Sequence, residues 1–112
     1  VAIGSVSGDR GRKGNPVYGA TKAALENYLE SLRNRLAPYG ASVVTVKPGP
    51  VETGMTAPRG RLPGMISAQR AAALILRAAR RKNVTAYIPW RWWLVSKIIR
   101  LIPSPIFRRL TI

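Results

Sequence analysis

Short apolar runs alternate with longer amphipathic segments over residues 1–89. The apolar runs are residues 1–5, 42–46 and 84–88, and their Val, Ile and Thr content is typical of buried strands. Between these runs, apolar side chains recur at three- and four-residue spacing, which predicts two helices. The order strand–helix–strand–helix–strand predicts an α/β fold, namely the C-terminal half of a doubly wound, parallel, Rossmann-type sheet.

Both predicted helices carry local start or stop signals. Asn15-Pro16 predicts a helix start with Asn15 as the N-cap, and Pro38 and Gly40 predict its end. Ser67 is the expected N-cap of the second helix. The side chains expected to pack inward are Ala24, Leu25, Tyr28, Leu29, Leu32 and Leu36 on the first helix, and Ala71, Ala72, Leu74, Ile75, Ala78 and Ala79 on the second.

The connection over residues 54–65 has the composition of a loop. It contains three Gly and two Pro, which interrupt both helices and strands. We expect a mobile segment that can act as a lid over a substrate cleft.

The chemistry of the chain changes after residue 89, so we divide it into residues 1–89 and a basic aromatic tail, residues 90–112. On a helix, the tail presents an apolar face made of Leu94, Val95, Ile98, Ile99, Leu101 and Ile102, with Trp93, Ser96, Lys97 and Arg100 opposite. This amphipathic pattern is typical of a helix lying in a membrane interface, and its charges argue against a span. The alternative is a helix that packs on the protein body or on a second copy in a homo-oligomer.

The net charge of +15 is distributed unevenly. All four acidic residues, Asp9, Glu26, Glu30 and Glu52, lie in the first half, and only bases follow Arg59. A basic surface suits nucleic acid or an anionic membrane, but the continuous apolar face of the tail favours lipid and we expect no nucleic-acid partner. The chain has no Cys and no His, which excludes disulfides, Cys/His zinc sites and His-based triads within these residues. We therefore expect no metal.

Tyr18 and Lys22 are four residues apart on the first turns of the predicted helix, so their side chains share one face. A free phenol has a pKa of about 10, and a neighbouring ammonium and the helix N-terminus both favour the phenolate. Tyr18 is therefore a candidate general acid/base. Ser5 ends a predicted strand thirteen residues earlier and can hold a substrate oxygen, with Ser7 as the alternative serine. The other interpretation is a partly buried aromatic beside a solvated charge.

Three motifs follow one another in the chain: Gly4-Ser-Val-Ser-Gly8, Tyr18-Gly-Ala-Thr-Lys22-Ala-Ala and Lys47-Pro-Gly-Pro-Val-Glu-Thr53. Over about residues 1–89, their order and spacing resemble those of the short-chain dehydrogenase/reductases. The resemblance implies hydride transfer between a nicotinamide cofactor and a carbonyl or alcohol. It implies that Ser5 polarises the substrate carbonyl and Tyr18 exchanges the proton, while Lys22 favours the phenolate and hydrogen-bonds the nicotinamide ribose.

The same resemblance implies further cofactor contacts. Pro48 and Gly49 would shape a turn along the nicotinamide, the Val51 backbone would meet its carboxamide, and the Thr53 hydroxyl would contact the carboxamide or a nearby phosphate. Without the resemblance, Pro48-Gly49 is an ordinary turn after a strand. In the family, the Gly-rich phosphate loop and the residue that separates NAD from NADP precede this part of the chain. The cofactor is therefore NAD or NADP, and we expect a C-terminal portion of a longer, cytoplasmic enzyme.

The segment Ile102-Pro-Ser-Pro-Ile-Phe-Arg-Arg-Leu110, together with the first two motifs, resembles one branch of the family. That branch reduces a 2-keto-pentose carried on a polyprenyl phosphate, as decaprenylphosphoryl-2-keto-pentose reductases do. We therefore expect a lipid-linked sugar or another hydrophobic carbonyl compound as substrate, with the tail at the inner face of a membrane. The alternative is a non-catalytic, basic lipid- or nucleic-acid-binding module in which Tyr18 and Lys22 are incidental.

Overall fold

The computed structural model describes all 112 residues and is built on a small parallel sheet. Its strands are β1 (Ala2–Ile3), β2 (Thr45–Pro48) and β5 (Thr85–Ile88), in the order β1-β2-β5. Both pairs are parallel, so the predicted α/β fold of the Rossmann type is confirmed. The strand expected at residues 42–46 lies later in the chain, because β2 continues through Pro48 alongside β5.

Two long helices follow β1 and precede β5. Helix α1 (Pro16–Leu36) begins at Pro16 as predicted and is followed by a 3-10 turn, η2 (Ala37–Tyr39). Gly40 then adopts a left-handed conformation with φ of 71°, which confirms the predicted end. Asn15 occupies the N-cap position, but its side chain makes no capping hydrogen bond, so this part of the prediction is wrong.

Helix α2 (Ala68–Arg80) is capped as the sequence predicts. The Ser67 hydroxyl oxygen accepts a hydrogen bond from the Arg70 backbone N–H at 3.1 Å. This bond satisfies one of the donors that a helix start leaves without an intrahelical partner.

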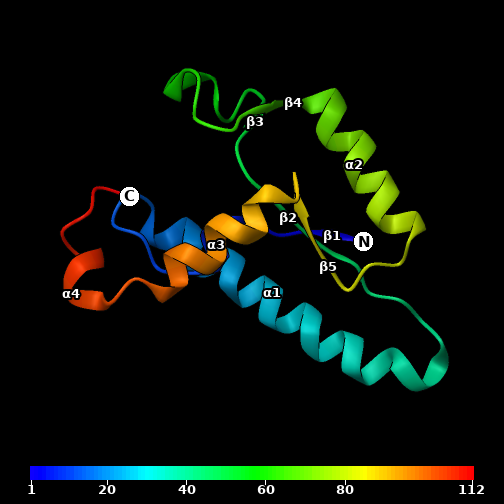
Figure 1. Ribbon diagram of the computed structural model, residues 1–112. Coiled ribbons are helices and arrows are strands. Elements are labelled where there is room, and N and C mark those ends of the chain that lie inside the picture. Colours follow the sequence, from blue (N-terminus) through cyan, green and yellow to red (C-terminus); the bar gives the residue numbers. More distant parts are fainter.

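The two faces of the sheet differ in chemistry because side chains alternate along each strand. One face carries Val44, Val46 and Ile88, which form the apolar core together with Ala86 and with Ala78 of α2. The other face carries Thr45, Lys47 and Tyr87, and it is covered by polar side chains of α1 and by α3 (Arg91–Leu101). In Figure 1, α1 and α2 accordingly lie on opposite sides of the strands.

The inward-facing residues of the helices are fewer than predicted. On α1 only Leu29 of the predicted face is buried, and Tyr28 and Ala24 are exposed. The reason is that the inward stripe of α1 includes the partly buried Glu26 and Arg33, which contact Lys47 and Thr45 on the polar face of the sheet. On α2, Ala71 and Ala78 are buried and Leu74, Ile75 and Ala79 are partly buried, whereas Ala72 is exposed.

Residues 53–65 form a loop whose base is closed by a second sheet. Strand β3 (Val51–Glu52) pairs in parallel with β4 (Ile66–Ser67), and a 3-10 turn, η3 (Ala57–Arg59), lies between them. The sequence predicted the loop but not these two strands, each of which is only two residues long. This pairing joins the two ends of the loop.

The tail packs on the body through α3, and a short helix, α4 (Ser104–Phe107), follows it. One residue of the face expected to be solvated packs instead: Ser96 is only 2% exposed, whereas Trp93, Lys97 and Arg100 are exposed. The predicted apolar face lies largely outside, with Leu94, Val95, Ile98 and Leu101 exposed. This correction follows from the polar surface that α3 meets, because Lys47 and Tyr87 lie on the face of the sheet that it covers. No helix is both long enough and apolar enough to cross a bilayer.

Arg10 fixes the end of α3 against the N-terminal loop. Its guanidinium donates hydrogen bonds to the carbonyls of Ile99 and Ile102, the latter at 2.6 Å, and lies 3.8 Å from the centroid of the Phe107 ring. Arg10 therefore joins the tail to the loop that follows β1.

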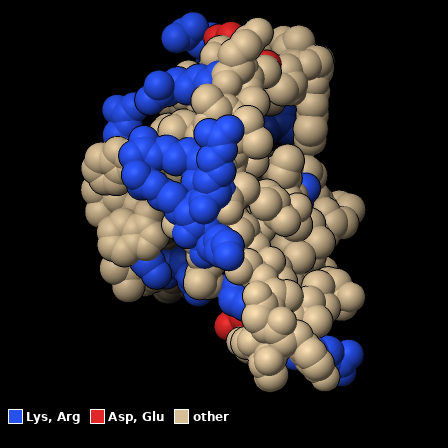
Figure 2. All heavy atoms as spheres, turned by 90° about the vertical axis from the view of Figure 1, so that its right-hand side faces the viewer, with Lys and Arg blue, Asp and Glu red and all other residues tan.

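The uneven charge of the sequence reappears on the surface. Figure 2 shows the face that carries α2, where Lys and Arg side chains form a nearly continuous band and acidic atoms appear only in isolated spots. Arg70, Arg77 and Arg80 are among the exposed bases of α2. This face is a strongly positive surface.

Candidate active site

A cavity of about 510 Å³ lies where β1 and β2 end and α1 begins. The carboxyl ends of parallel strands meet at one edge of a sheet, which is where such folds bind ligands. The structure brings together all of the predicted site residues around this cavity: Ser5, Tyr18, Lys22, Pro48, Gly49, Val51 and Thr53. Ser7 also lines it, so the alternative serine is not separated from Ser5 by position alone.

Ser5 is held rigidly at the end of β1. Its backbone N–H donates to Glu26 Oε1 at 2.8 Å, and its hydroxyl oxygen accepts from the Ser7 backbone N–H at 3.1 Å. These bonds start a 3-10 turn, η1 (Val6–Gly8), and leave the residue 7% exposed. The Ser5 hydroxyl proton has no acceptor within the chain, so it is available to a ligand in the cavity.

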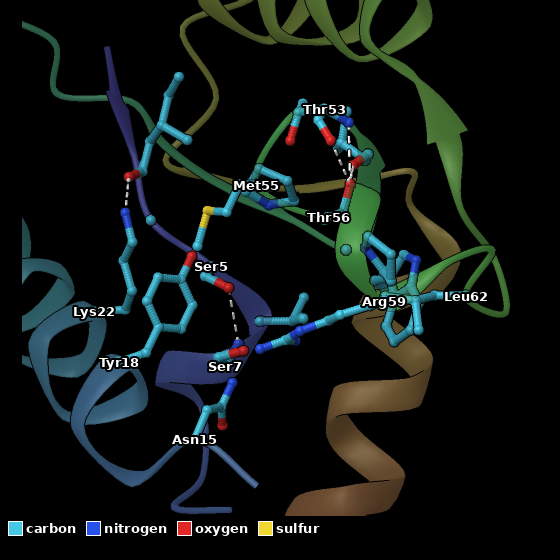
Figure 3. Close-up of a pocket in the computed structure, with 18 of the residues that line it drawn as sticks. Ser5, Ser7, Asn15, Tyr18, Lys22, Thr53, Met55, Thr56, Arg59 and Leu62 are labelled. Atoms are coloured by element: carbon cyan, nitrogen blue, oxygen red, sulfur yellow. Dashed lines mark hydrogen bonds between the residues drawn. The ribbon is translucent and has the colours of Figure 1, made fainter.

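Tyr18 and Lys22 project from the first turns of α1, as their spacing predicts. The Lys22 ammonium donates to the Ile3 carbonyl at 3.1 Å and lies 5.7 Å from the centroid of the Tyr18 ring. The Tyr18 hydroxyl makes no hydrogen bond within the chain, and Figure 3 shows it directed toward Ser5. Gly19 allows the start of α1 to lie close to η1, since a Cβ at this position would lie only 2.9 Å from the Ser7 carbonyl oxygen.

The opposite wall is formed by the segment that follows β2 and by the tail. Pro48, Gly49 and Val51 line the cavity there, and the Trp92 indole packs directly against Gly49. A Cβ on Gly49 would overlap this ring, so only glycine fits. The Thr56 hydroxyl bonds the Val51 carbonyl at 2.6 Å, which turns the chain toward the loop that ends at β4.

Directly behind Ser5 lies a buried network of charges. The Lys47 ammonium is 2.7 Å from Asp9 Oδ1 and 3.3 Å from Glu26 Oε2, and the Tyr87 hydroxyl donates to Asp9 Oδ2 at 2.8 Å. The Asp9 side chain is 4% exposed. Because Glu26 also accepts from the Ser5 N–H, the network ties the position of Ser5 to the sheet and to α1.

The network shifts the pKa values of its members in the directions that favour the observed charges. Burial by itself raises the pKa of Asp9, but hydrogen bonds from Lys47 and Tyr87 outweigh it and lower that pKa below its usual value. Burial lowers the pKa of Lys47, but Asp9 and then Glu26 raise it above its usual value. Burial and the bond to Asp9 both raise the pKa of Tyr87. The ion pairs therefore persist across the neutral pH range.

Sequence reasoning missed three groups at this site. Glu26 lies one turn beyond Lys22, so the helical period could have placed it on the same face. Arg12 lies in a loop without a periodic pattern, and Trp92 was assigned to a membrane-facing tail; both line the cavity. Figure 3 shows Arg59 and Leu62 across the cavity from Tyr18, contributed by the loop between β3 and β4.

Comparison with known proteins identifies the class. The family model of the short chain dehydrogenases matches residues 1–62, which is more than half of the chain. The chain therefore belongs to this family, the short-chain dehydrogenase/reductases.

Three relatives illustrate the match. An uncharacterized oxidoreductase of Streptomyces coelicolor is 34% identical over 112 residues, which are 100% of this chain and 44% of that protein. An uncharacterized oxidoreductase of Mycobacterium tuberculosis is 32% identical over 110 residues, 98% of this chain and 44% of the relative. An acetoacetyl-CoA reductase of Synechocystis is 35% identical over 91 residues, 81% of this chain and 31% of the relative. The chain thus spans less than half the length of the curated relatives it matches.

Proposed function

We propose that this chain supplies the catalytic residues of an NAD(P)-dependent oxidoreductase that interconverts a carbonyl and an alcohol. One observation carries the proposal: Ser5, Tyr18 and Lys22 meet on one wall of a cavity, and the hydroxyls of Ser5 and Tyr18 have free protons facing it. This is the donor set that a ketone oxygen needs as negative charge develops on it.

The residues around the cavity fit a nicotinamide cofactor. The Lys22 ammonium has three protons and donates one to the Ile3 carbonyl, so the others can bind ribose hydroxyls. Across the cavity, the backbone from Pro48 to Val51 and the side chain of Thr53 offer polar groups to a carboxamide. When bound, the nicotinamide supplies or accepts the hydride.

Each residue of the chain then has a distinct task. The Ser5 hydroxyl donates a hydrogen bond to the carbonyl oxygen and holds it beside Tyr18. In the direction of reduction, the Tyr18 O–H gives its proton to that oxygen as the carbonyl becomes an alcohol, and Lys22 stabilises the phenolate left behind. In the reverse direction, the Tyr18 phenolate takes the proton from the alcohol.

We propose a hydrophobic substrate, such as a lipid-linked sugar or another amphiphilic carbonyl compound. The cavity lining includes four large apolar side chains, those of Val51, Met55, Leu62 and Trp92. Two of these residues come from the loop between β3 and β4, which is therefore the proposed lid. The relative named as an acetoacetyl-CoA reductase supports the direction of carbonyl reduction.

We further propose that the tail docks the enzyme on an anionic bilayer. The exposed side chains of Leu94, Val95, Ile98 and Leu101 give α3 an outward apolar surface, although Ser96 faces the body. Exposed bases accompany this surface, including Arg91, Lys97 and Arg100. Since Trp92 of the same helix lines the cavity, docking through α3 would bring the site close to a lipid substrate.

The direct test is the Tyr18→Phe substitution in the complete protein, with Tyr28→Phe as its matched control. Tyr28 lies on the same helix but is exposed, 62% of its surface being accessible. With NADH or NADPH and long-chain methyl ketones as probe substrates, we expect Tyr18→Phe to lower kcat by about 10²–10⁴, the usual contribution of general acid catalysis. Tyr28→Phe should keep the turnover of the parent.

Wild-type turnover by Tyr18→Phe would refute the assigned proton donor. Vesicle binding without any nicotinamide oxidation, over a broad panel of carbonyl compounds, would instead favour the non-catalytic lipid-binding module.

A further inference from the structure

The ionisable side chains that line the cavity are almost all of one sign, which is positive. The lining includes three bases, Arg12, Lys22 and Arg59, and no Asp or Glu. The acidic residues nearest in sequence, Asp9 and Glu26, lie in the network behind Ser5 and not in the cavity wall. A partly enclosed space lined by cations concentrates anions, so its ligand is expected to carry negative charge.

Arg12 is the only one of these three bases with a buried donor that lacks a hydrogen-bond partner. Its Nε is buried and has no hydrogen-bond partner, and the side chain forms no ion pair within the chain. Burial lowers the pKa of the Arg12 guanidinium, and Asp9 raises it from a distance. Asp9 accepts from Lys47 and Tyr87, and no hydrogen bond or ion pair joins it to Arg12.

The other two bases differ from Arg12. Lys22 is tied to the Ile3 carbonyl beside Tyr18, where it serves the proton donor. Arg59 belongs to the exposed 3-10 turn η3, so water satisfies it. Arg12 is half-buried, and its buried Nε–H costs free energy unless a ligand supplies the missing acceptor. Arginine also offers a fork of N–H donors that suits phosphate and carboxylate oxygens.

We propose that Arg12 binds an anionic group, a phosphate or a carboxylate, on the substrate whose carbonyl lies between Ser5 and Tyr18. The inference rests on the proposed function and narrows it to amphiphilic carbonyl compounds with a negative charge near the reacting carbon. Arg12 lies in the loop between Ser5 and Tyr18 and lines the same cavity. The residues proposed to meet the nicotinamide carboxamide, Val51 and Thr53, come from the segment that follows β2.

The experiment measures binding and not turnover. Octyl phosphate, octanoate and octanol, kept below their micelle concentrations, are titrated calorimetrically into the complete protein. The same titrations are run with Arg12→Gln and with Arg70→Gln, which removes an exposed base of α2 and is the matched control. We expect Arg12→Gln to weaken binding of the anionic probes by about tenfold or more, as loss of a charge-assisted hydrogen bond does. Octanol binding should not change, and Arg70→Gln should bind all three probes like the parent.

The anion could also come from the cofactor, so NADPH and NADH are titrated in parallel. Unchanged cofactor affinity in Arg12→Gln supports a substrate anion, whereas an equal loss for cofactor and octyl phosphate overturns that assignment. Equal binding of octyl phosphate by Arg12→Gln and the parent overturns the inference entirely. The unfolding temperature tests for a structural role instead. Because Arg12 has no partner in the chain, Arg12→Gln should leave the unfolding temperature unchanged or raise it, and a clear fall contradicts the ligand role.

Failure of the proposed function would look different. Arg12-dependent binding of octyl phosphate together with no carbonyl reduction would refute the oxidoreductase activity. A protein that reduces carbonyl compounds in a Tyr18-dependent manner, but binds the anionic probes independently of Arg12, would refute only the anion site.

Discussion

The buried network around Asp9 offers a quantitative test of how the active-site wall is held. Asp9→Asn keeps the size of the side chain but removes its charge, so Lys47 retains only Glu26, at 3.3 Å, as an ion-pair partner. Removal of one member of a buried ion pair destabilises a protein by about 3–5 kcal/mol. Asn can still accept the hydrogen bond from Tyr87, so we expect the lower end, about 3 kcal/mol.

The pH dependence follows from the directions of the pKa shifts. The pKa of Asp9 is lower in the folded protein than its unfolded value of about 3.9, so its contribution is full above that pH and is lost as the pH falls through the folded value. The pKa values of Lys47 and Tyr87 are raised, so their contributions are lost only as the pH rises through their folded values, above about 10. The difference between parent and Asp9→Asn should therefore be constant near neutral pH and shrink below about pH 4.

Urea unfolding of the complete protein, followed by circular dichroism across this pH range, measures the difference. Glu52→Gln is the control, because its ion pair with Arg61 spans 3.6 Å between exposed side chains and should contribute less than about 1 kcal/mol. If Asp9→Asn is no more destabilising than Glu52→Gln, or if its cost is unchanged at pH 3, the account of the network is wrong.

Two further predictions concern the loop and the tail. Trypsin should cut the complete protein at Arg59 or Arg61, both exposed, and cofactor with substrate should protect both sites; equal cleavage rates with and without ligands would argue against a lid. Anionic vesicles should bind the parent, less so as salt rises, and Ile98→Ser with Leu101→Ser should weaken the association. Val84→Ser, which alters an exposed apolar residue away from the tail, should leave the association unchanged. If the parent protein does not bind anionic vesicles at low salt, the membrane role is excluded.

Local chemistry in the sequence was enough to predict the main elements. Pro16 marks the start of α1, Gly40 follows its end in a left-handed conformation, and Ser67 caps α2 as expected. These features depend on neighbouring residues only, so they can be inferred without knowledge of the fold. The small strands β3 and β4 could not be inferred in this way. Each is only two residues long, which is too short for a periodic pattern, and their pairing is decided by the loop between them.

The candidate site was also largely visible in the sequence. Tyr18 and Lys22 share a helix face by spacing. Ser5 follows β1 and Pro48 ends β2, and the parallel pairing of these strands brings their ends together. The roles of these residues stay predictions until activity is measured.

Contacts between distant parts of the chain were decided by the tertiary structure alone. Asp9 bonds Tyr87, which is 78 residues away, and Arg10 bonds the carbonyl of Ile102, 92 residues away. Ser96 lies on the polar side of α3 by periodicity, yet it is buried, while Lys97 and Arg100 of the same side stay exposed. Local periodicity ranks the faces of a helix by polarity, but which face is covered depends on the chemistry of the surface opposite. The sequence therefore determined the elements and the catalytic spacing, and the packing of the tail and the loop determined that Arg12 and Trp92 line the same cavity.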